Sequence, residues 1–215
     1  MTAETRASKR VELPGSTELE VRGPELSLRY ARPEDAARLF RLAADVEVTR
    51  YFSWGPYTSE RQAADYIENL ARKRLEGERL ELVIDHRDAG VIGVTGLSEF
   101  SLRDRRAVVG TWHGQKWWGT GANRQSKALV MALAFAGLRL GRVTAWCGTE
   151  NKRSQAALEK LGFVHEGVLR EWHVHGGQPK DVIAYSMLRR EWERSELAQE
   201  PFEITGRIPR QFVVP

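Results

Sequence analysis

The sequence contains a single cysteine, Cys147, among 215 residues. One cysteine excludes an intramolecular disulfide, fits a reducing compartment and leaves no Cys/His cluster for a metal. No apolar run reaches the roughly 18 residues that a membrane-spanning helix needs. Residues 1–12 are mixed in charge and lack the apolar stretch of a signal peptide. From these absences we expect a cytoplasmic protein with no metal and no membrane partner.

An excess of charge of one sign is also missing. The net charge is only +4, and the basic residues are scattered along the chain instead of forming a stripe. A weak positive balance suits an anionic ligand, or it is simply a solvated surface. Without a basic stripe we do not expect a nucleic-acid partner. The 41% hydrophobic and 29% charged residues are typical of a globular chain.

Residue spacing divides the chain into three parts. Residues 1–24 have no sustained period and contain Pro14 and Gly15, which predicts a loosely attached N-terminal arm. Residues 25–197 hold the periodic segments and form the expected domain. Residues 198–215 are a C-terminal tail rich in proline, arginine and apolar residues. We expect this tail to dock either on the domain or on a partner chain in a homodimer.

Apolar runs of period two predict strands, and apolar residues three and four apart predict helices. The predicted strands are residues 26–31, 80–84, 91–97, 107–113, 142–147, 166–174 and 181–188. The predicted helices are residues 33–43, 60–76, 124–140, 151–161 and 191–197. Short turns within 80–113 favour antiparallel strands, and the helix 124–140 should make its two flanking strands parallel. The fold class is therefore α/β or α+β, a single domain with a mixed central sheet of about six to seven strands and about four flanking helices.

Residues 116–123, Lys-Trp-Trp-Gly-Thr-Gly-Ala-Asn, join a predicted strand to a predicted helix. Such a turn leaves the first amides of the helix unpaired, and the helix dipole adds partial positive charge there. An anion, most often a phosphate, fits that place. Taken alone, the pattern also fits a tight turn with no ligand.

This turn resembles the acyl-CoA pyrophosphate loop of the GNAT superfamily of N-acetyltransferases, usually written Q/R-x-x-G-x-G/A. The Trp-Gly-Thr-Gly of residues 118–121, the Asn-Lys-Arg-Ser of 151–154 and the Leu-Glu-Lys-Leu-Gly-Phe of 158–163 resemble its RimJ/RimL-like branch. The Glu-Gly-Val-Leu-Arg of residues 166–170 continues the same pattern. The resemblance covers residues 26–192. It implies the GNAT fold with splayed central strands, and acetyl-CoA or another short acyl-CoA as co-substrate.

The resemblance also implies which residues bind the acyl-CoA. They are Trp112, His113, Lys116, Trp118, Gly119, Thr120, Gly121, Ala122, Asn123, Asn151 and Ser154. The glycines let the backbone approach the pyrophosphate. Lys116 stands where Arg or Gln is commoner, so it keeps the charge and loses the bidentate fork. Asn151 is either a ligand or a helix cap, and one residue can do both.

The implied reaction is attack of a neutral amine on a thioester, which requires a group that removes a proton from the amine. The candidate bases are Glu99 and His113, each with the alternative of being a solvated strand end, and Glu166 is a third. Ser154 is the candidate hydrogen-bond donor to the leaving thiolate, or else an ordinary first-turn residue. Leu158 stands where many relatives carry a tyrosine acid, so we do not expect that mechanism here.

Aromatic residues are concentrated before the second predicted helix, in a region that lines the acceptor pocket of the family fold. The candidates for acceptor binding are Tyr51, Phe52 and Trp54. For any single ring, core packing is the alternative. Trp146 and Cys147 are expected in the core, Cys147 with no catalytic role, and His173 and His175 are expected to be exposed.

The sequence thus predicts an acetyl-CoA-dependent N-acetyltransferase that acts on a primary amine by direct transfer in a ternary complex. The acceptor is a protein N-terminus or a small molecule. Modification of an aminoglycoside is an alternative that would need an acidic pocket, and residues 48–57 offer none. A second alternative is a catalytically silent acyl-CoA-binding regulatory or scaffolding domain. The missing tyrosine at Leu158 allows that alternative, and the intact glycine turn opposes it.

Overall fold

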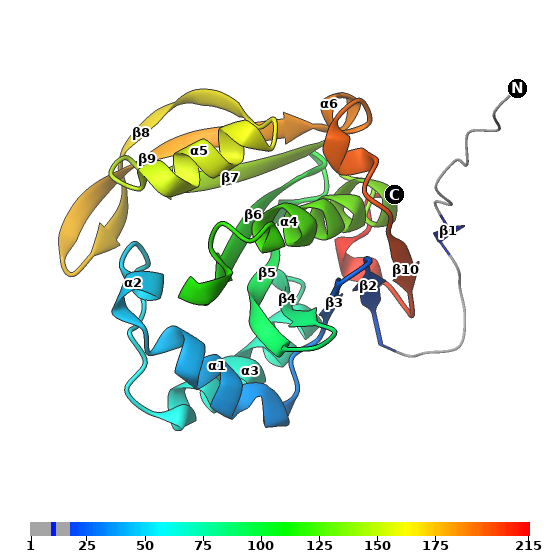
Figure 1. Ribbon diagram of the computed structural model, residues 1–215. Helices are drawn as coiled ribbons and strands as arrows, with labels where there is room; N and C mark the ends of the chain where they lie inside the picture. Colours follow the sequence, from blue (N-terminus) through cyan, green and yellow to red (C-terminus); the bar gives the residue numbers. More distant parts are fainter. Residues whose placement is uncertain (1–9, 12–17) are drawn as a thin grey trace, which may run out of the picture.

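One mixed β-sheet runs through the molecule, as the computed structural model in Figure 1 shows for residues 10–11 and 18–215. The strands of these residues are β1 (Arg10–Val11), β2 (Glu20–Arg22), β3 (Leu26–Arg29), β4 (Arg79–His86), β5 (Gly90–Ser101), β6 (Arg106–His113), β7 (Arg142–Gly148), β8 (Val164–His175), β9 (Gln178–Leu188) and β10 (Glu203–Thr205). Their order across the sheet is β1-β10-β2-β3-β4-β5-β6-β7-β9-β8. The α-helices are α1 (Ala36–Ala43), α2 (Val46–Thr49), α3 (Glu60–Leu75), α4 (Ala122–Ala132), α5 (Lys152–Lys160) and α6 (Arg189–Trp192). None of the described helices is long and apolar enough to cross a membrane.

The expected numbers of strands and helices were too low, since the described residues form ten strands and six α-helices. The additional strands β1, β2 and β10 have two or three residues each, too few for an alternating pattern to show. The unexpected α2 is a single turn capped by the Asp45 carboxylate. The antiparallel order of β4, β5 and β6 and the parallel pairing of β6 with β7 are confirmed.

Side chains alternate between two cores on opposite faces of the sheet. On β4, Leu80 and Leu82 belong to a core that α4 and α5 cover, whereas Val83 belongs to a second core that α1 and α3 cover. The alternation follows from the pleat of the strand, which points successive side chains to opposite faces. Groups on α4 and α5 therefore reach the sheet from one side, and groups on α1 and α3 reach it from the other.

The two central strands β6 and β7 are paired for only part of their length. Their parallel ladder joins residues 106–108 to residues 142–144 and ends there. Beyond that point β6 stays paired with β5 as far as His113, and β7 stays paired with β9 as far as Gly148. Because each strand follows a different neighbour, a gap opens between residues 109–113 and residues 145–148.

Both ends of the chain contribute to the sheet. Of the N-terminal arm predicted for residues 1–24, residues 1–9 and 12–17 lie outside the described residues, and its strand β2 pairs with β3. The C-terminal tail docks on the domain, because β10 pairs with β2 and with β1. Phe212 of this tail is fully buried, with its ring centroid 4.6 Å from that of Phe100.

Replacing Phe212 with alanine should therefore destabilise the whole domain. We expect the Phe212→Ala variant to lose about 3–5 kcal/mol of unfolding free energy, the usual cost of removing a fully buried ring. Urea denaturation measures this loss. The matched control is Phe52→Ala, because Phe52 is 36% exposed and its removal should cost less than about 1 kcal/mol. Equal losses in the two variants would mean that the tail does not stabilise the domain.

Candidate functional site

The turn before α4 is open and has the geometry of an anion cradle. Gly119 and Gly121 have φ values of +76° and +95°, and a Cβ at either position would meet no atom within 4 Å. Two side chains hold the turn in place: Thr120 Oγ1 donates to the Trp117 carbonyl at 2.9 Å, and Trp118 Nε1 donates to the His113 carbonyl at 3.1 Å. The Ala122 amide donates to Thr120 Oγ1 at 3.4 Å, and the amides of Gly121 and Asn123 on either side of it have no acceptor among the contacts of the described residues. At such a helix start the dipole favours an anion.

A groove of about 270 Å³ continues from this turn between α4, α5 and the parted strands, and we call it the α4–α5 groove. Its lining includes Gly119, Asn123, Lys127, Asn151, Arg153 and Ser154. Its lining includes the cations of Lys127 and Arg153 and not one aspartate or glutamate among the described residues. A groove with positive charge and no acidic residue suits a ligand that carries phosphates.

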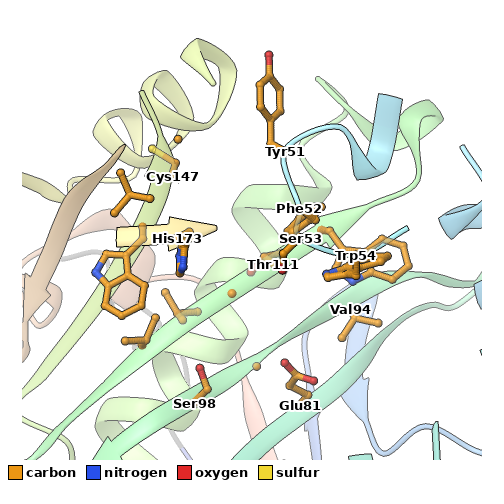
Figure 2. Close-up of a pocket in the computed structure, with 18 of the residues that line it drawn as sticks. Tyr51, Phe52, Ser53, Trp54, Glu81, Val94, Ser98, Thr111, Cys147 and His173 are labelled. Atoms are coloured by element: carbon orange, nitrogen blue, oxygen red, sulfur yellow. The ribbon is translucent and has the colours of Figure 1, made fainter. Parts of the chain in front are cut away.

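A larger cavity of about 750 Å³ lies on the opposite face of the sheet, against α3 and the loop that follows α2, and we call it the aromatic cavity (Figure 2). Tyr51, Phe52 and Trp54 are all in its lining. The Phe52 and Trp54 rings stack with centroids 5.0 Å apart, and Trp54 meets Trp112 of β6 edge-on at 5.6 Å. The structure thus brings the three predicted aromatic residues to one wall.

The groove and the aromatic cavity meet in the gap between β6 and β7, which we call the junction. Both are lined by Gly110, Thr111 and Trp112 of β6 and by Trp146, Cys147 and Gly148 of β7. A molecule bound in the groove can therefore contact a molecule bound in the cavity through the gap between β6 and β7. This arrangement suits the transfer of a group between two bound molecules.

His113 lies in the groove wall and not in the lining of the aromatic cavity. Its Nε2 is 3.0 Å from Ser126 Oγ of α4, and the side chain is buried. Burial, with smaller contributions from the cations of Lys127 and Arg153, lowers the pKa of His113 to about 3. The imidazole is therefore neutral at physiological pH and is a weak proton acceptor.

Glu99 lines the aromatic cavity at its exposed edge. It occupies an irregularity in the pairing of β5 with β6 and has a positive φ of 52°. A second carboxylate in this cavity, Glu81 of β4, was missed from the sequence. Its side chain is only 19% exposed and accepts hydrogen bonds from Tyr66 Oη at 3.2 Å and from Arg79 Nη1 at 3.4 Å. A signal was present, because Glu81 is the one charged residue between the apolar residues of its strand, at 80–84.

Asn151 and Ser154 meet at the start of α5, where both line the groove. The Asn151 side chain accepts from the Ser154 amide at 3.1 Å, so Asn151 caps the helix. The Ser154 side chain lowers the pKa of the neighbouring Cys147 thiol, although burial raises that pKa by more. The described contacts thus hold Ser154 beside the junction.

Three basic residues surround the groove in different ways. The Lys116 ammonium lies over the Trp117 ring, 5.0 Å from its centroid, and Lys116 is not in the groove lining. The Arg153 guanidinium, which was missed from the sequence, lies 3.2 Å from the centroid of the Trp118 ring. Lys127, also missed, is buried in α4 and lines the groove. Lys127 follows four polar residues at 123–126, a pattern that also fits a solvated helix face, so the sequence gave no clear signal of a ligand site.

Two expectations for residues of β7 and β8 that line the aromatic cavity were wrong. Trp146 is not core, because it is half-buried and lines the aromatic cavity, where its centroid is 5.2 Å from that of Trp172. His173 and His175 are half-buried in the same cavity lining instead of exposed. In both cases β8 and β9 extend past the end of β7, so their side chains reach over the junction. Cys147 is buried, as expected.

Comparison with known proteins gives a consistent picture. Residues 25–164 match the family model described as the acetyltransferase (GNAT) domain. The chain is 33% identical to the uncharacterized N-acetyltransferase p20 of Bacillus licheniformis over 78% of its own length and 94% of that protein. It is 32% identical to the uncharacterized N-acetyltransferase YoaA of Bacillus subtilis, over 76% and 93% of the two chains. A solved spermidine N-acetyltransferase from Vibrio cholerae superposes with a TM-score of 0.68 over 78% and 98% of the chains, and its 22% identity shows likeness of fold alone.

The buried imidazole of His113 should make the protein sensitive to acid. The pKa of His113 in the folded state lies below the ordinary value of 6.5. Below pH 6.5, His113 therefore binds a proton in the unfolded chain and stays unprotonated in the native state. Stability should then fall by up to about 1.4 kcal/mol per pH unit as the pH drops below about 6.5. We expect His113→Asn to remove this contribution in urea denaturation between about pH 6.5 and 4.5, and imidazole NMR to show neutral His113 throughout. A His113 titration with a midpoint near 6.5 would contradict the burial argument.

Proposed function

The chain belongs to the GNAT family of acetyltransferases, and from that premise we propose that it transfers the acetyl group of acetyl-CoA directly to a primary amine bound in the aromatic cavity. The observation that supports this proposal most strongly is the junction, where the two parted strands line both the groove and the cavity. Acetyl-CoA supplies an acyl group activated as a thioester. The protein holds it on one face of the sheet, and the amine approaches from the other.

The residues around the groove fit the donor. The open amides between Gly119 and Asn123 would bind its pyrophosphate, and Arg153 and Lys116 would add positive charge beside it. The edge of β6 along residues 109–113 has no strand partner on the side of β7. Free backbone N–H and C=O groups on such an edge suit the amide-containing arm of acetyl-CoA, which can pair with them as an added strand would.

The amine must lose a proton, and Glu81 and Glu99 are the candidates for it among the four carboxylates that line the cavity. We propose Glu81 as the proton acceptor, because it is partly buried in the lining of the cavity and Tyr66 holds it in place. Burial, followed by the charge of Glu81, raises the pKa of Tyr66 well above its ordinary value, so Tyr66 stays protonated and donates. Glu99 is the second candidate at the exposed edge. The neutral, enclosed His113 then forms part of the groove wall.

Ser154 is the proposed hydrogen-bond donor to the sulfur that leaves. Its position beside Cys147 at the junction supports this role. A thiolate is a fair leaving group, so one hydrogen bond suffices and no strong acid is required. Leu158, which stands in place of the tyrosine acid of many relatives, is buried in the core against Phe163 and its neighbours.

The cavity also bears on the class of acceptor. Its lining contains the acids Glu81, Glu99, Glu150 and Asp181 and the bases Arg50, Lys73, Arg79 and Lys180. Opposite charges in equal number give no strongly acidic pocket, which disfavours a polycation such as an aminoglycoside. The aromatic wall favours an amine attached to an apolar or aromatic body, in a small molecule or at a protein N-terminus.

The proposal predicts release of free thiol from acetyl-CoA when a suitable amine is added. The assay uses a panel of aromatic amines, polyamines, aminoglycosides and short peptides, and we expect turnover with members that carry an aromatic body next to the amine. Gly121→Val provides the control, because a branched side chain at φ +95° is strained and enters the anion cradle. It should weaken acetyl-CoA binding at least about tenfold. Acetyl-CoA binding without turnover of any amine would instead favour the silent regulatory or scaffolding domain.

The two carboxylates can be separated by substitution. We expect Glu81→Gln to lower kcat/KM for the amine by about 100-fold or more, because the proton acceptor is lost. Glu99→Gln, the matched control in the same cavity, should lower it by less than about tenfold. Initial rates from about pH 6 to 9 measure both. The reverse order of effects would assign the base to Glu99.

A further inference from the structure

Lys127 is a buried cation with which no carboxylate of the described residues forms an ion pair. Its side chain belongs to the middle of α4 and only 4% of the residue is exposed. Nζ donates to Thr111 Oγ1 at 2.7 Å, and no ion pair with Lys127 is present among residues 18–215. Burying an ammonium without an opposite charge is costly, and an apolar side chain of similar length would avoid that cost. Its presence therefore indicates an interaction beyond core packing.

Lys127 lies next to the junction, on the side of the groove. Thr111 lines both the groove and the aromatic cavity, so the ammonium that bonds to it lies at the point where the two meet. Asn123 and Lys127 are four residues apart in α4, which puts them on one side of the helix, and both line the groove. The groove thus leads from the glycine turn, past Asn123, to Lys127.

The hydrogen bonds around Lys127 leave it with donors to spare. Thr95 Oγ1 donates to the Gly110 carbonyl at 3.1 Å, so the 2.6 Å contact between Thr95 and Thr111 must use the Thr111 hydrogen. Thr111 Oγ1 can then only accept from Lys127. This series of hydrogen bonds uses one N–H of the Lys127 ammonium. The other N–H groups of the ammonium have no acceptor among the contacts of the described residues. The groove is the space that Lys127 shares with a ligand.

We propose that Lys127 donates a hydrogen bond to the carbonyl oxygen of the acyl thioester at the junction and stabilises the negative charge that this oxygen gains during transfer. The inference rests on the proposed acetyl transfer. As the amine nitrogen bonds to the carbonyl carbon, the C=O electron pair moves onto the oxygen beside Lys127. It returns when the C–S bond breaks, the sulfur leaves with the bonding pair, and the amine proton goes to the cavity carboxylate. Lys127 itself is unchanged at the end.

The charge state of Lys127 gives the role a pH dependence. Burial lowers the pKa of Lys127 to about 7. The other titratable or charged groups in the groove lining are Tyr51 after α2, His113 of β6, Cys147 of β7 and Arg153 of α5. None of these described groups is a carboxylate that would raise the pKa of Lys127 again. In the free enzyme the ammonium is therefore lost as the pH rises above about 7, and with it the stronger form of the donor.

The test measures the thioester carbonyl directly, without an acceptor amine. Infrared difference spectra of acetyl-CoA labelled with ¹³C at the carbonyl would be recorded bound to the wild-type chain, to Lys127→Met and to Lys160→Met, a control at the exposed end of α5. We expect the carbonyl band of the wild type and of Lys160→Met at lower frequency than that of Lys127→Met. With an amine that turns over, Lys127→Met should lower kcat by about 10²–10³-fold and change KM for acetyl-CoA less.

Each outcome bears on the proposal. A carbonyl band at the same frequency in the wild type and in Lys127→Met overturns it. If Lys127→Met does not fold, the wild type alone decides: its band should move to higher frequency between about pH 6 and 10 as Lys127 loses its charge, and a constant band overturns the proposal. A shifted band together with no turnover of any amine supports the contact with Lys127 and counts against the proposed function instead.

Discussion

The parting of β6 and β7 after Val108 is the constraint on which the rest of this structure depends. β6 stays paired with β5, and β7 stays paired with β9, so neither strand is left unpaired on both edges. The gap is therefore a stable feature of the sheet. α4 starts at one end of the gap and places its glycine turn there. The loop after α2 covers the opposite face with aromatic rings. A sheet that stayed fully paired would have kept the groove and the cavity apart.

Burial controls the chemistry around that gap. His113 and Lys127 extend into the same enclosed space between α4 and the sheet, and the loss of water lowers the pKa of both. His113 is thereby kept neutral, and the pKa of Lys127 is lowered to about 7. On the more open face Glu81 remains in contact with Tyr66 and the cavity. The two faces of the sheet thus provide different environments, one that suits a polarising donor and one that suits a proton acceptor.

Much of the fold could be predicted from the sequence, because its longer elements have clear periods. The hairpin of β4 and β5, the parallel pair around α4 and the last hairpin all agree with the predicted segments. The short strands β2 and β10 could not be found in the same way, since three residues carry no period. Their pairing depends on residues 20–22 and 203–205 meeting in space, and this contact between distant segments leaves no local pattern.

The sequence by itself determined the glycine turn at residues 116–123, the family and the aromatic loop that lines the cavity, because each depends on a few neighbouring residues and their backbone angles. Only the tertiary structure decided that Glu81 faces the cavity, that His113 is enclosed and that Lys127 lies at the junction. The reason is physical: the role of an ionisable side chain is set by its solvent exposure and its neighbours. Those neighbours come from strands and helices that are far apart along the chain.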